Sequence, residues 1–440
     1  MTDFDKTRLL TFNLTEFWAV VKFLPPRKRV SPEICSRSRR RNGLFPAKPL
    51  KLDKSSEERE DAACVKRGNF YNINARSAVE RGRGGRRLNE DVLINKGKIL
   101  KTSLTIGNVV VSPPVLSAPM AGYTNYAHRE LLRYLGGVGL IATEMVSARA
   151  FVCMEARGDG EPPRLWGVAE EPRPLAVQIW DNTPETLEEL ARRLAKELNV
   201  SVVDLNFGCP APAIAKRSAS GSYLLRDPAK VGELVGRVAR ICAPTPVTAK
   251  IRLGLTADSV NAVDVAQAVE EAGGAALTVH GRTAKQMYSG FADWDEIAKI
   301  KGVLRKIPLI GNGDVKTPSE AVERLQNYPV DGIMIGRAGL DKPWIFRQIA
   351  QALRGETPEP DPTLREQRDL LLKHYSLVVD RFGRERAVVM MRKIACHYSK
   401  GRPGGRNFRD KIARVATEEE FLATVRDAFV VEPDATDENI

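Results

Sequence analysis

The chain has 440 residues, of which 43% are hydrophobic and only 6% are aromatic. This length suits one large barrel or two to three modules, and the composition favours an α/β core over a sandwich rich in aromatic residues. The sequence has no long apolar run and no CxxC pair among its six cysteines. We therefore expect no membrane span, no zinc site and no disulfide framework, as is typical of a protein of the reducing cytoplasm.

The formal net charge is +13, and it is unevenly distributed. Residues 1–100 carry +11, residues 101–360 carry +1, residues 361–412 carry +7 and residues 413–440 carry −6. Basic segments on both sides of a neutral middle indicate a polyanionic partner. The alternative for the second basic segment is an ordinary solvated helix face.

Residues 1–100 show no sustained hydrophobic periodicity and include the stretch RGRGGRR at positions 81 to 87. This composition predicts a basic and poorly ordered N-terminal extension. A mis-assigned translation start is the alternative explanation.

From about residue 104, short apolar runs that end in polar residues or glycine alternate with helical stretches. We count eight such runs: VLSAPMAG (115–122), LIATEMV (140–146), PLAVQIW (174–180), VVDLNFGCP (202–210), PVTAKIRLG (246–254), ALTVHGRT (276–283), PLIGNGDV (308–315) and GIMIGRAG (332–339). Strands that are apolar throughout and alternate with amphipathic helices indicate a parallel sheet covered by helices. Eight units, with no GxGxxG after the first strand, favour a closed (β/α)8 TIM barrel over residues 101–350.

A Pro-rich linker over 351–362 leads to a predicted small all-helical domain over 363–440, which ends in an acidic tail. Thr363 and Glu366 form a capping box for a helix that continues to Phe382. A second helix is predicted from about residue 385 to 398, and Thr417 with Glu420 caps a last one.

The strongest local signal for chemistry is Cys209, which follows the fourth strand between Gly208 and Pro210. The carboxyl ends of barrel strands form the active face, and a thiol there can act as an acid, a nucleophile or a redox group. We interpret the other five cysteines as small buried hydrophobes, which is the usual fate of a free cysteine. They are Cys35, Cys64, Cys153, Cys242 and Cys396.

Glycine-rich turns end the seventh and eighth strands, at 311–314 and 336–338, where barrels commonly bind phosphate. Gln178, Lys250 and His280 end the third, fifth and sixth strands, and such groups in apolar strands indicate a polar ligand. A structural role for His280 is the alternative. This combination fits a flat ring system with a phosphate tail, such as FMN. No HxH, HExxH or paired-carboxylate pattern supports a metal site or a glycosidase.

These motifs resemble the tRNA-dihydrouridine synthase family over about residues 104–425, and most of all its bacterial B-type branch. The matching segments are APMAGYTN (118–125), TEM (143–145), DLNFGCP (204–210), SGSYLL (220–225), AKIRLG (249–254), VHGRT (279–283), GNGDV (311–315), MIGRA (334–338) and HYSKGRPGGR (397–406).

The resemblance implies an FMN-dependent enzyme that reduces the C5=C6 bond of uridine in the tRNA D-loop with electrons from NADPH. Cys209 would donate the proton to C5, while Asn206, Arg252 and Tyr288 would lie near the uracil. FMN would be held by Pro119, Met120, Gln178, Lys250, His280, Asn312, Gly313, Asp314, Gly336 and Arg337. The family pattern does not include the N-terminal extension, and Trp180-Asp181-Asn182 stands where a small turn is more familiar.

Two other functions stay open at this point. One is a flavin barrel enzyme that acts on a small molecule such as dihydroorotate, which leaves the basic helical domain unexplained. The other is an RNA-binding protein that has lost catalysis, against which Cys209, Lys250 and His280 argue. For the enzyme we expect a cytoplasmic monomer that binds tRNA and needs neither a membrane nor a metal.

Overall fold

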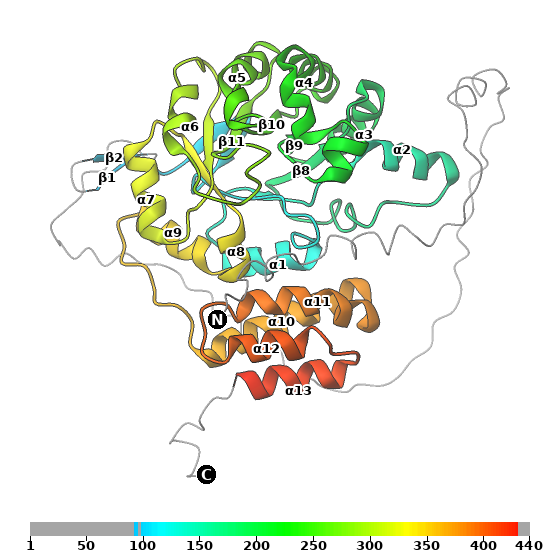
Figure 1. Ribbon diagram of the computed structural model, residues 1–440, viewed down its shortest axis with the longest axis vertical. Helices are drawn as coiled ribbons and strands as arrows, with labels where there is room; N and C mark the ends of the chain where they lie inside the picture. The colour runs from blue at the N-terminus through cyan, green and yellow to red at the C-terminus, as the bar shows by residue number, and fades with distance from the viewer. Residues whose placement is uncertain (1–91, 96–97, 430–440) are drawn as a thin grey trace, which may run out of the picture. The chain divides into compact units, whose positions relative to one another are not determined.

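The computed structural model describes residues 92–95 and 98–429 (Figure 1). The predicted extension therefore lies outside the described residues up to position 91, as does the acidic tail from 430 onward. Of the last residues of the extension, the structure describes β1 (Val92–Asn95) and β2 (Lys98–Lys101), which pair as an antiparallel hairpin.

A parallel barrel forms the centre of the molecule, and its eight strands are those predicted. They are β5 (Val115–Ser117), β6 (Ile141–Ala142), β8 (Leu175–Trp180), β9 (Val202–Phe207), β10 (Val247–Arg252), β11 (Ala276–His280), β12 (Leu309–Asn312) and β13 (Gly332–Ile335). They pair in the order β5-β13-β12-β11-β10-β9-β8-β6, and the short strand β7 (Val146–Ser147) pairs with β8. A parallel bridge between Leu116 and Leu140 closes the ring. The predicted TIM barrel is confirmed.

Helices on the outside of the barrel follow the strands (Figure 1). They are α1 (Tyr126–Leu135), α2 (Ala148–Arg157), α3 (Pro184–Lys196), α4 (Pro228–Cys242), α5 (Ala262–Glu271), α6 (Trp294–Ile300), α7 (Pro318–Asn327), α8 (Arg337–Asp341) and α9 (Ile345–Leu353). Several of them bury an apolar stripe against the sheet, as Leu187, Leu190 and Leu194 of α3 do. This packing forms the larger of the two barrel cores, between sheet and helices.

A second, smaller core fills the inside of the barrel, where alternate strand residues point inward. Leu116, Ala176 and Ile310 are among its members. A hairpin of β3 (Leu104–Ile106) and β4 (Val109–Val111) adds buried side chains to this core from the amino-terminal side of the strands. Because one end of the barrel is filled in this way, only the carboxyl end of the strands is left for a site.

The C-terminal module consists of α10 (Leu364–Phe382), α11 (Arg384–Tyr398), α12 (Gly405–Ile412) and α13 (Glu418–Ala428). The capping boxes predicted at Thr363 and Thr417 are both present, with reciprocal bonds to Glu366 and Glu420. We did not predict α12, which begins directly after Gly404 in a left-handed conformation. The module and α1 share one apolar core, so the two parts pack against each other.

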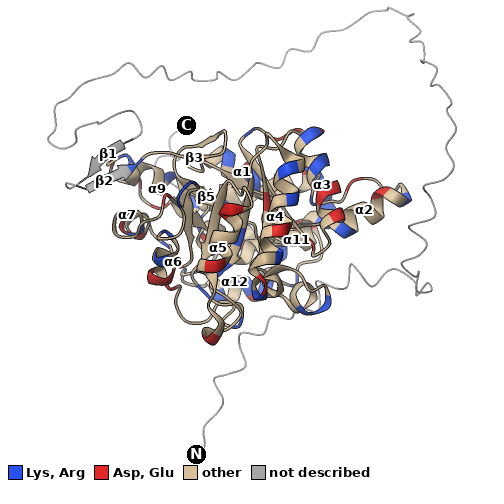
Figure 2. Ribbon diagram, turned by 90° about the horizontal axis from the view of Figure 1, so that it is seen from above, with Lys and Arg blue, Asp and Glu red and all other residues tan. Residues whose placement is uncertain are grey.

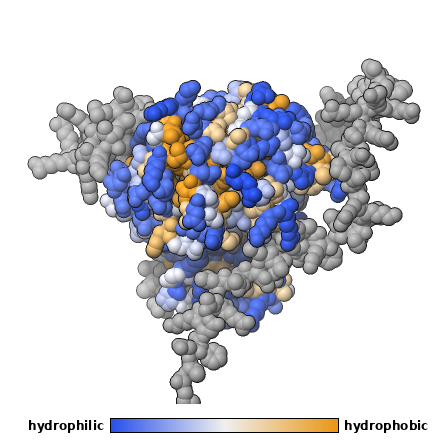
Figure 3. Space-filling model, turned by 45° about the horizontal axis from the view of Figure 1, so that its top comes forward, coloured by the Kyte–Doolittle hydropathy of each residue, from blue (hydrophilic) through white to orange (hydrophobic). Residues whose placement is uncertain are grey.

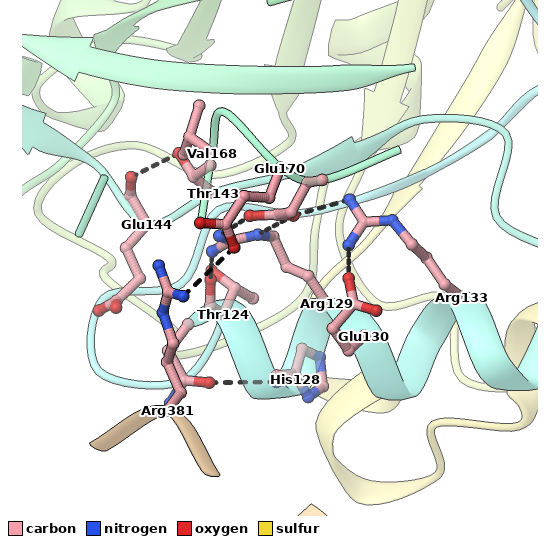
Figure 4. A network of polar contacts seen from close by, with 12 residues as sticks. Thr124, His128, Arg129, Glu130, Arg133, Thr143, Glu144, Val168, Glu170 and Arg381 are labelled. Atoms are coloured by element: carbon pink, nitrogen blue, oxygen red, sulfur yellow. Dashed lines mark hydrogen bonds and ion pairs between the residues drawn. The ribbon is translucent and has the colours of Figure 1, made fainter. Parts of the chain in front are cut away.

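Polar contacts also join the module to the barrel. Arg381 of α10 reaches Glu170 of the barrel at 3.4 Å, next to the buried ion pair that Arg129 of α1 forms with Glu171 (Figure 4). On the other side, His397 Nδ1 lies 2.5 Å and Lys400 Nζ 2.8 Å from Asp341 of α8. Because Asp341 follows the eighth strand, α11 lies close to the carboxyl end of the barrel.

The surface is mixed in character. Basic and acidic residues are both spread over the outer helices (Figure 2), and Figure 3 shows small apolar groups separated by hydrophilic ones on one face. Within residues 92–95 and 98–429, no helix combines the length and the apolarity that a membrane crossing requires.

Candidate active site at the mouth of the barrel

A chain of hydrogen bonds links the inward-facing polar side chains of β8, β9 and β10. Asp204 lies deepest, and its two carboxyl oxygens accept from Gln178 Nε2 and Thr248 Oγ1, each at 2.7 Å. Gln178 Oε1 in turn accepts from Asn206 Nδ2 at 2.7 Å. Burial raises the pKa of Asp204 above its usual value, although the bonds from Thr248 and Gln178 oppose this effect. The orientation of Gln178 and Asn206 is thereby fixed from below.

Asn206 also shapes the turn that carries the thiol. Its Oδ1 accepts from the backbone N–H groups of Gly208 at 3.2 Å and Cys209 at 2.9 Å. On the other side, Gly221 approaches so closely that a Cβ there would lie 2.8 Å from the Cys209 carbonyl oxygen. Burial raises the pKa of the Cys209 thiol, and this outweighs the opposing effects of the Ala211 N–H, Arg252 and Lys250. The thiol is therefore held in its protonated form.

Lys250 lies two residues before the end of β10, with its ammonium group directed into the mouth. Its Nζ donates to Asn312 Oδ1 at 3.1 Å, and Asn312 Nδ2 donates to the Met334 carbonyl at 2.8 Å. Burial, together with the nearby charge of Arg252, lowers the pKa of Lys250 to about 8. The ammonium group is thus predominantly charged at neutral pH, and its single protein acceptor leaves N–H groups for a ligand.

Three arginines make the mouth strongly cationic. Asp314 holds two of them, because its carboxyl oxygens accept from Arg282 at 2.6 Å and Arg337 at 3.2 Å. Arg252 lies buried on β10 and donates to the Gly208 carbonyl at 2.9 Å. Burial and the charges of Lys250, Arg252, Arg282 and Arg337 lower the pKa of His280, so its imidazole is neutral.

The glycine turns after β12 and β13 flank this cationic cluster. Gly313 has φ of 128°, and a Cβ there would lie 2.6 Å from Ala292, so only glycine fits. At Gly336 a Cβ would lie 3.6 Å from Met120 Sδ, which places the turn after β5 beside the turn after β13. Pro119 precedes Met120 in that turn. The predicted phosphate turns and the predicted Pro119-Met120 segment thus share one side of the mouth.

Tyr288 lies at the rim rather than inside the barrel. It is 54% exposed, and its ring centroid is 6.4 Å from that of His280. The guanidinium carbons of Arg337 and Arg252 lie 4.8 and 5.7 Å from the ring centroid. All the predicted site residues thus lie on the strand ends of the barrel or on the loops that follow them.

Two charged residues in the loops at the carboxyl ends of the strands were not predicted from the sequence. Arg164 donates to the Met145 carbonyl at 2.8 Å, lies 3.9 Å from Glu144 and favours ionisation of Cys209 electrostatically. The Gly122 N–H donates to Glu144, which ties the loop after β5 to the end of β6. Glu144 belongs to the TEM segment that carries the resemblance, whereas Arg164 lies in an irregular stretch without a recognisable pattern.

Asp181 stands where the family pattern has a small turn, and its hydrogen bonds explain its position. Its carboxylate accepts from Arg149 at 2.8 Å, from the Asn182 N–H at 2.7 Å and from Thr186 Oγ1 at 2.9 Å. Asp181 therefore braces the turn before α3 and ties it to Arg149 of α2 instead of entering the mouth. Throughout the described part of the chain, no three His, Cys, Asp or Glu side chains are grouped to hold a metal ion.

The fold and the site together define a barrel enzyme whose mouth carries a protonated thiol, a neutral imidazole and several cations. The family model described as "Dihydrouridine synthase (Dus)" matches residues 116–432. A probable tRNA-dihydrouridine synthase of Rickettsia prowazekii is 36% identical over 74% of this chain and 99% of its own length. The tRNA-dihydrouridine synthase B of Pseudomonas aeruginosa is 38% identical over 74% of this chain and 95% of its own.

The chain therefore belongs to the dihydrouridine synthase family, and the predicted family and enzyme class, an oxidoreductase, are confirmed. Among solved structures, morphinone reductase in complex with tetrahydroNAD is similar with a TM-score of 0.42 at 15% identity. That match covers 59% of this chain and 92% of the other.

Proposed function

We propose that the protein is a tRNA-dihydrouridine synthase that reduces the C5=C6 bond of a D-loop uridine, with FMN as cofactor and NADPH as electron donor. The observation that carries this proposal is the Cys209 thiol at the end of a barrel strand, on a turn that Asn206 and Arg252 hold in place. A reduction of C5=C6 adds one hydride and one proton, and the proton needs an acid positioned at C5.

The residues of the mouth fit FMN. The exposed part of the cationic cluster at Arg337 and the glycine turns at Gly313 and Gly336 suit a phosphate tail, and Asp314 orients Arg337 through its carboxylate. Lys250 and neutral His280, with Gln178 and Asn312, offer hydrogen bonds for the polar edge of a flat ring. Pro119 and Met120 contribute an apolar side. When bound, FMN supplies the hydride for uracil C6, after reduction by NADPH.

The chain's own residues bind the uracil and protonate it. Asn206 and Arg252 hold the turn of Cys209 through its backbone, and Nη2 of Arg252 is left to donate to the base. Tyr288 covers the rim. Cys209 donates its proton to C5 from Sγ, which the raised pKa of the thiol permits at neutral pH. The helical module, with its excess of basic residues over 361–412, holds the tRNA while the uridine is swung out of the RNA.

The test is the mass analysis of nucleosides from tRNA that lacks dihydrouridine, after incubation with the purified holoenzyme and NADPH. We expect dihydrouridine with the wild type and with Cys153→Ala, which removes an exposed thiol of α2. We expect a loss of about 100-fold or more with Cys209→Ala, because a positioned acid is worth about 10²- to 10⁴-fold. A flavin-containing protein that modifies no tRNA would instead support the small-molecule enzyme.

A further inference from the structure

The loop over residues 284–292 presents apolar side chains to solvent at the rim of the mouth. Met287 is 40%, Tyr288 54% and Phe291 83% exposed, and Phe291 is the most exposed large hydrophobic residue of the described chain. Single exposed apolar residues are common on proteins and need no explanation. Three of them within five positions, beside a candidate active site, indicate a contact surface.

This loop is held rigidly from below. Arg252 Nη1 donates to the Met287 carbonyl at 2.8 Å, and Arg282 donates to the carbonyls of Ser289 at 3.1 Å and Gly290 at 2.7 Å. Both arginines are almost fully buried, with exposures of 3% and 1%. The loop is therefore fixed to the floor of the mouth by charged donors with little freedom to move.

Two further features hold the loop in the conformation that exposes these side chains. The Ala292 N–H donates to Asp314 at 2.7 Å, which anchors the far end of the loop to the same carboxylate that holds Arg282 and Arg337. Met287 has a φ of 51°. Residues other than glycine, asparagine and aspartate rarely adopt this left-handed backbone conformation. Local strain of this kind clusters at sites of ligand contact.

The chemistry of the surface matches an unpaired nucleotide. Aromatic faces stack on bases, and the loop combines them with Lys285 and no acidic residue between 281 and 292. The guanidinium carbon of Arg337 lies 4.8 Å from the Tyr288 ring centroid, so positive charge lies beside the aromatic faces. A stable protein interface buries about 1,200 Å² or more, for which three side chains are too few.

We propose that residues 284–292 form a stacking platform for an unpaired base next to the uridine that enters the barrel, with Phe291 as the stacking face. The inference rests on the proposed function and refines it, because it assigns part of the RNA affinity to the barrel itself. A rigid platform needs no ordering when the RNA binds, so the full stacking contribution goes into affinity.

The test uses the holoenzyme with four variants: Phe291→Ala, Phe291→Leu, Phe291→Trp and Val110→Ala. Val110 is 63% exposed on the hairpin at the other end of the barrel and serves as the matched control. The measured quantities are the KM for tRNA, kcat, and the rate at which NADPH bleaches the flavin without tRNA. We expect the Ala and Leu variants to raise KM about tenfold, which corresponds to the loss of one stacked base. Phe291→Trp and Val110→Ala should keep the wild-type KM, and flavin reduction should not change in any variant.

A second measurement ties the effect to a base. A tRNA with an abasic nucleotide beside the target uridine should bind the wild type about tenfold more weakly, and Phe291→Ala should show no further loss. The proposal would be overturned if the losses of affinity from the abasic tRNA and from Phe291→Ala were additive. A wild-type KM in Phe291→Leu would overturn it as well. So would a Phe291→Ala variant that loses self-association while its KM is unchanged, because the loop would then contact another copy of the protein. Absence of dihydrouridine from the wild type would instead contradict the proposed function.

Discussion

The mouth of the barrel and the interface between α1 and the helical module both contain buried polar side chains, but they satisfy them differently. In the mouth, Gln178, Asp204 and Asn206 form a connected set of hydrogen bonds. At the interface, His374 Nδ1 lies 3.2 Å from the Tyr398 hydroxyl, while His374 Nε2 has no hydrogen-bond partner. The difference teaches that the mouth is organised to hold ligand-facing groups in fixed orientations, whereas the interface tolerates a polar group that is costly to ionise.

The largest effect should come from breaking the connected set at its deepest member. Asp204→Ala leaves Gln178 Nε2 and Thr248 Oγ1 buried without their acceptor. We expect the free energy of unfolding to fall by about 3 kcal/mol, since an unsatisfied buried group costs about 1–3 kcal/mol. Urea unfolding measures this change. The matched control is Asp410→Ala on an exposed position of α12, which should stay within about 0.5 kcal/mol of the wild type. Equal stabilities of the two variants would contradict this account of the mouth.

The buried histidines between α1 and the helical module should make the stability of the protein depend on pH. Burial lowers the pKa of His374 to about 4, and burial also lowers that of His128, whose ring centroid lies 5.7 Å away. The unfolded chain, with ordinary imidazole groups near pH 6.5, binds more protons than the native state between these values. Stability is therefore fully present above about pH 6.5 and is lost as the pH falls toward 4.

For His374 alone, this loss amounts to about 3 kcal/mol at most. Urea unfolding across this pH range measures it. His374→Gln keeps a hydrogen-bonding group beside Tyr398 but does not titrate, so the slope of stability against pH should be smaller in this variant. Adding His128→Gln should reduce the slope further. An unchanged slope in the double variant would show that the acid sensitivity arises elsewhere.

The third prediction concerns the thiol turn in the mouth. In Gly221→Ala, a Cβ would lie 2.8 Å from the Cys209 carbonyl oxygen, and φ is 58°. We expect kcat for dihydrouridine formation to fall about tenfold, because catalysis depends on the position of the acid within about 1 Å. Gly273→Ala is the matched control. Its φ is 89°, but no atom from elsewhere in the chain lies within 4 Å of the Cβ that would be added there. Both variants carry the strain of a left-handed alanine, and only Gly221→Ala displaces the thiol. Equal kcat values would show that the strain alone matters.

Part of the fold and part of the site could be predicted from the sequence alone. The eight strands could be predicted because each is buried on both faces and reads as a continuous apolar run, and the helices α10 and α13 because their capping boxes are local. The start of α12 at Gly405 and the three-residue strands of β3 and β4 carry no comparable signal. Cys209, Lys250 and His280 could be found from their places at strand ends. Arg164 and the contact between His128 and His374 could not, because they depend on segments that are distant in sequence.

The smallest effect should arise where the two regions meet. Lys393 of α11 lies over the Tyr123 ring, 4.9 Å from its centroid, next to Gly122 in the loop after β5. Lys373 of α10 makes the same kind of contact with Tyr134 at 4.2 Å, at the end of α1. Lys393 thus lies beside the loop at the mouth, where burial lowers its pKa, whereas Lys373 lies at the far end of α1.

If the tRNA backbone passes between the module and the mouth, Lys393→Ala should weaken tRNA binding about two- to fivefold and lower the slope of log K against log salt by about one. Lys373→Ala should leave that slope unchanged. Filter binding of tRNA to the holoenzyme at several salt concentrations measures both. Each variant loses one cation–π contact, so the salt slope, rather than the binding constant itself, reports a phosphate contact of Lys393. Equal slopes for the two variants would place the tRNA backbone elsewhere on the module.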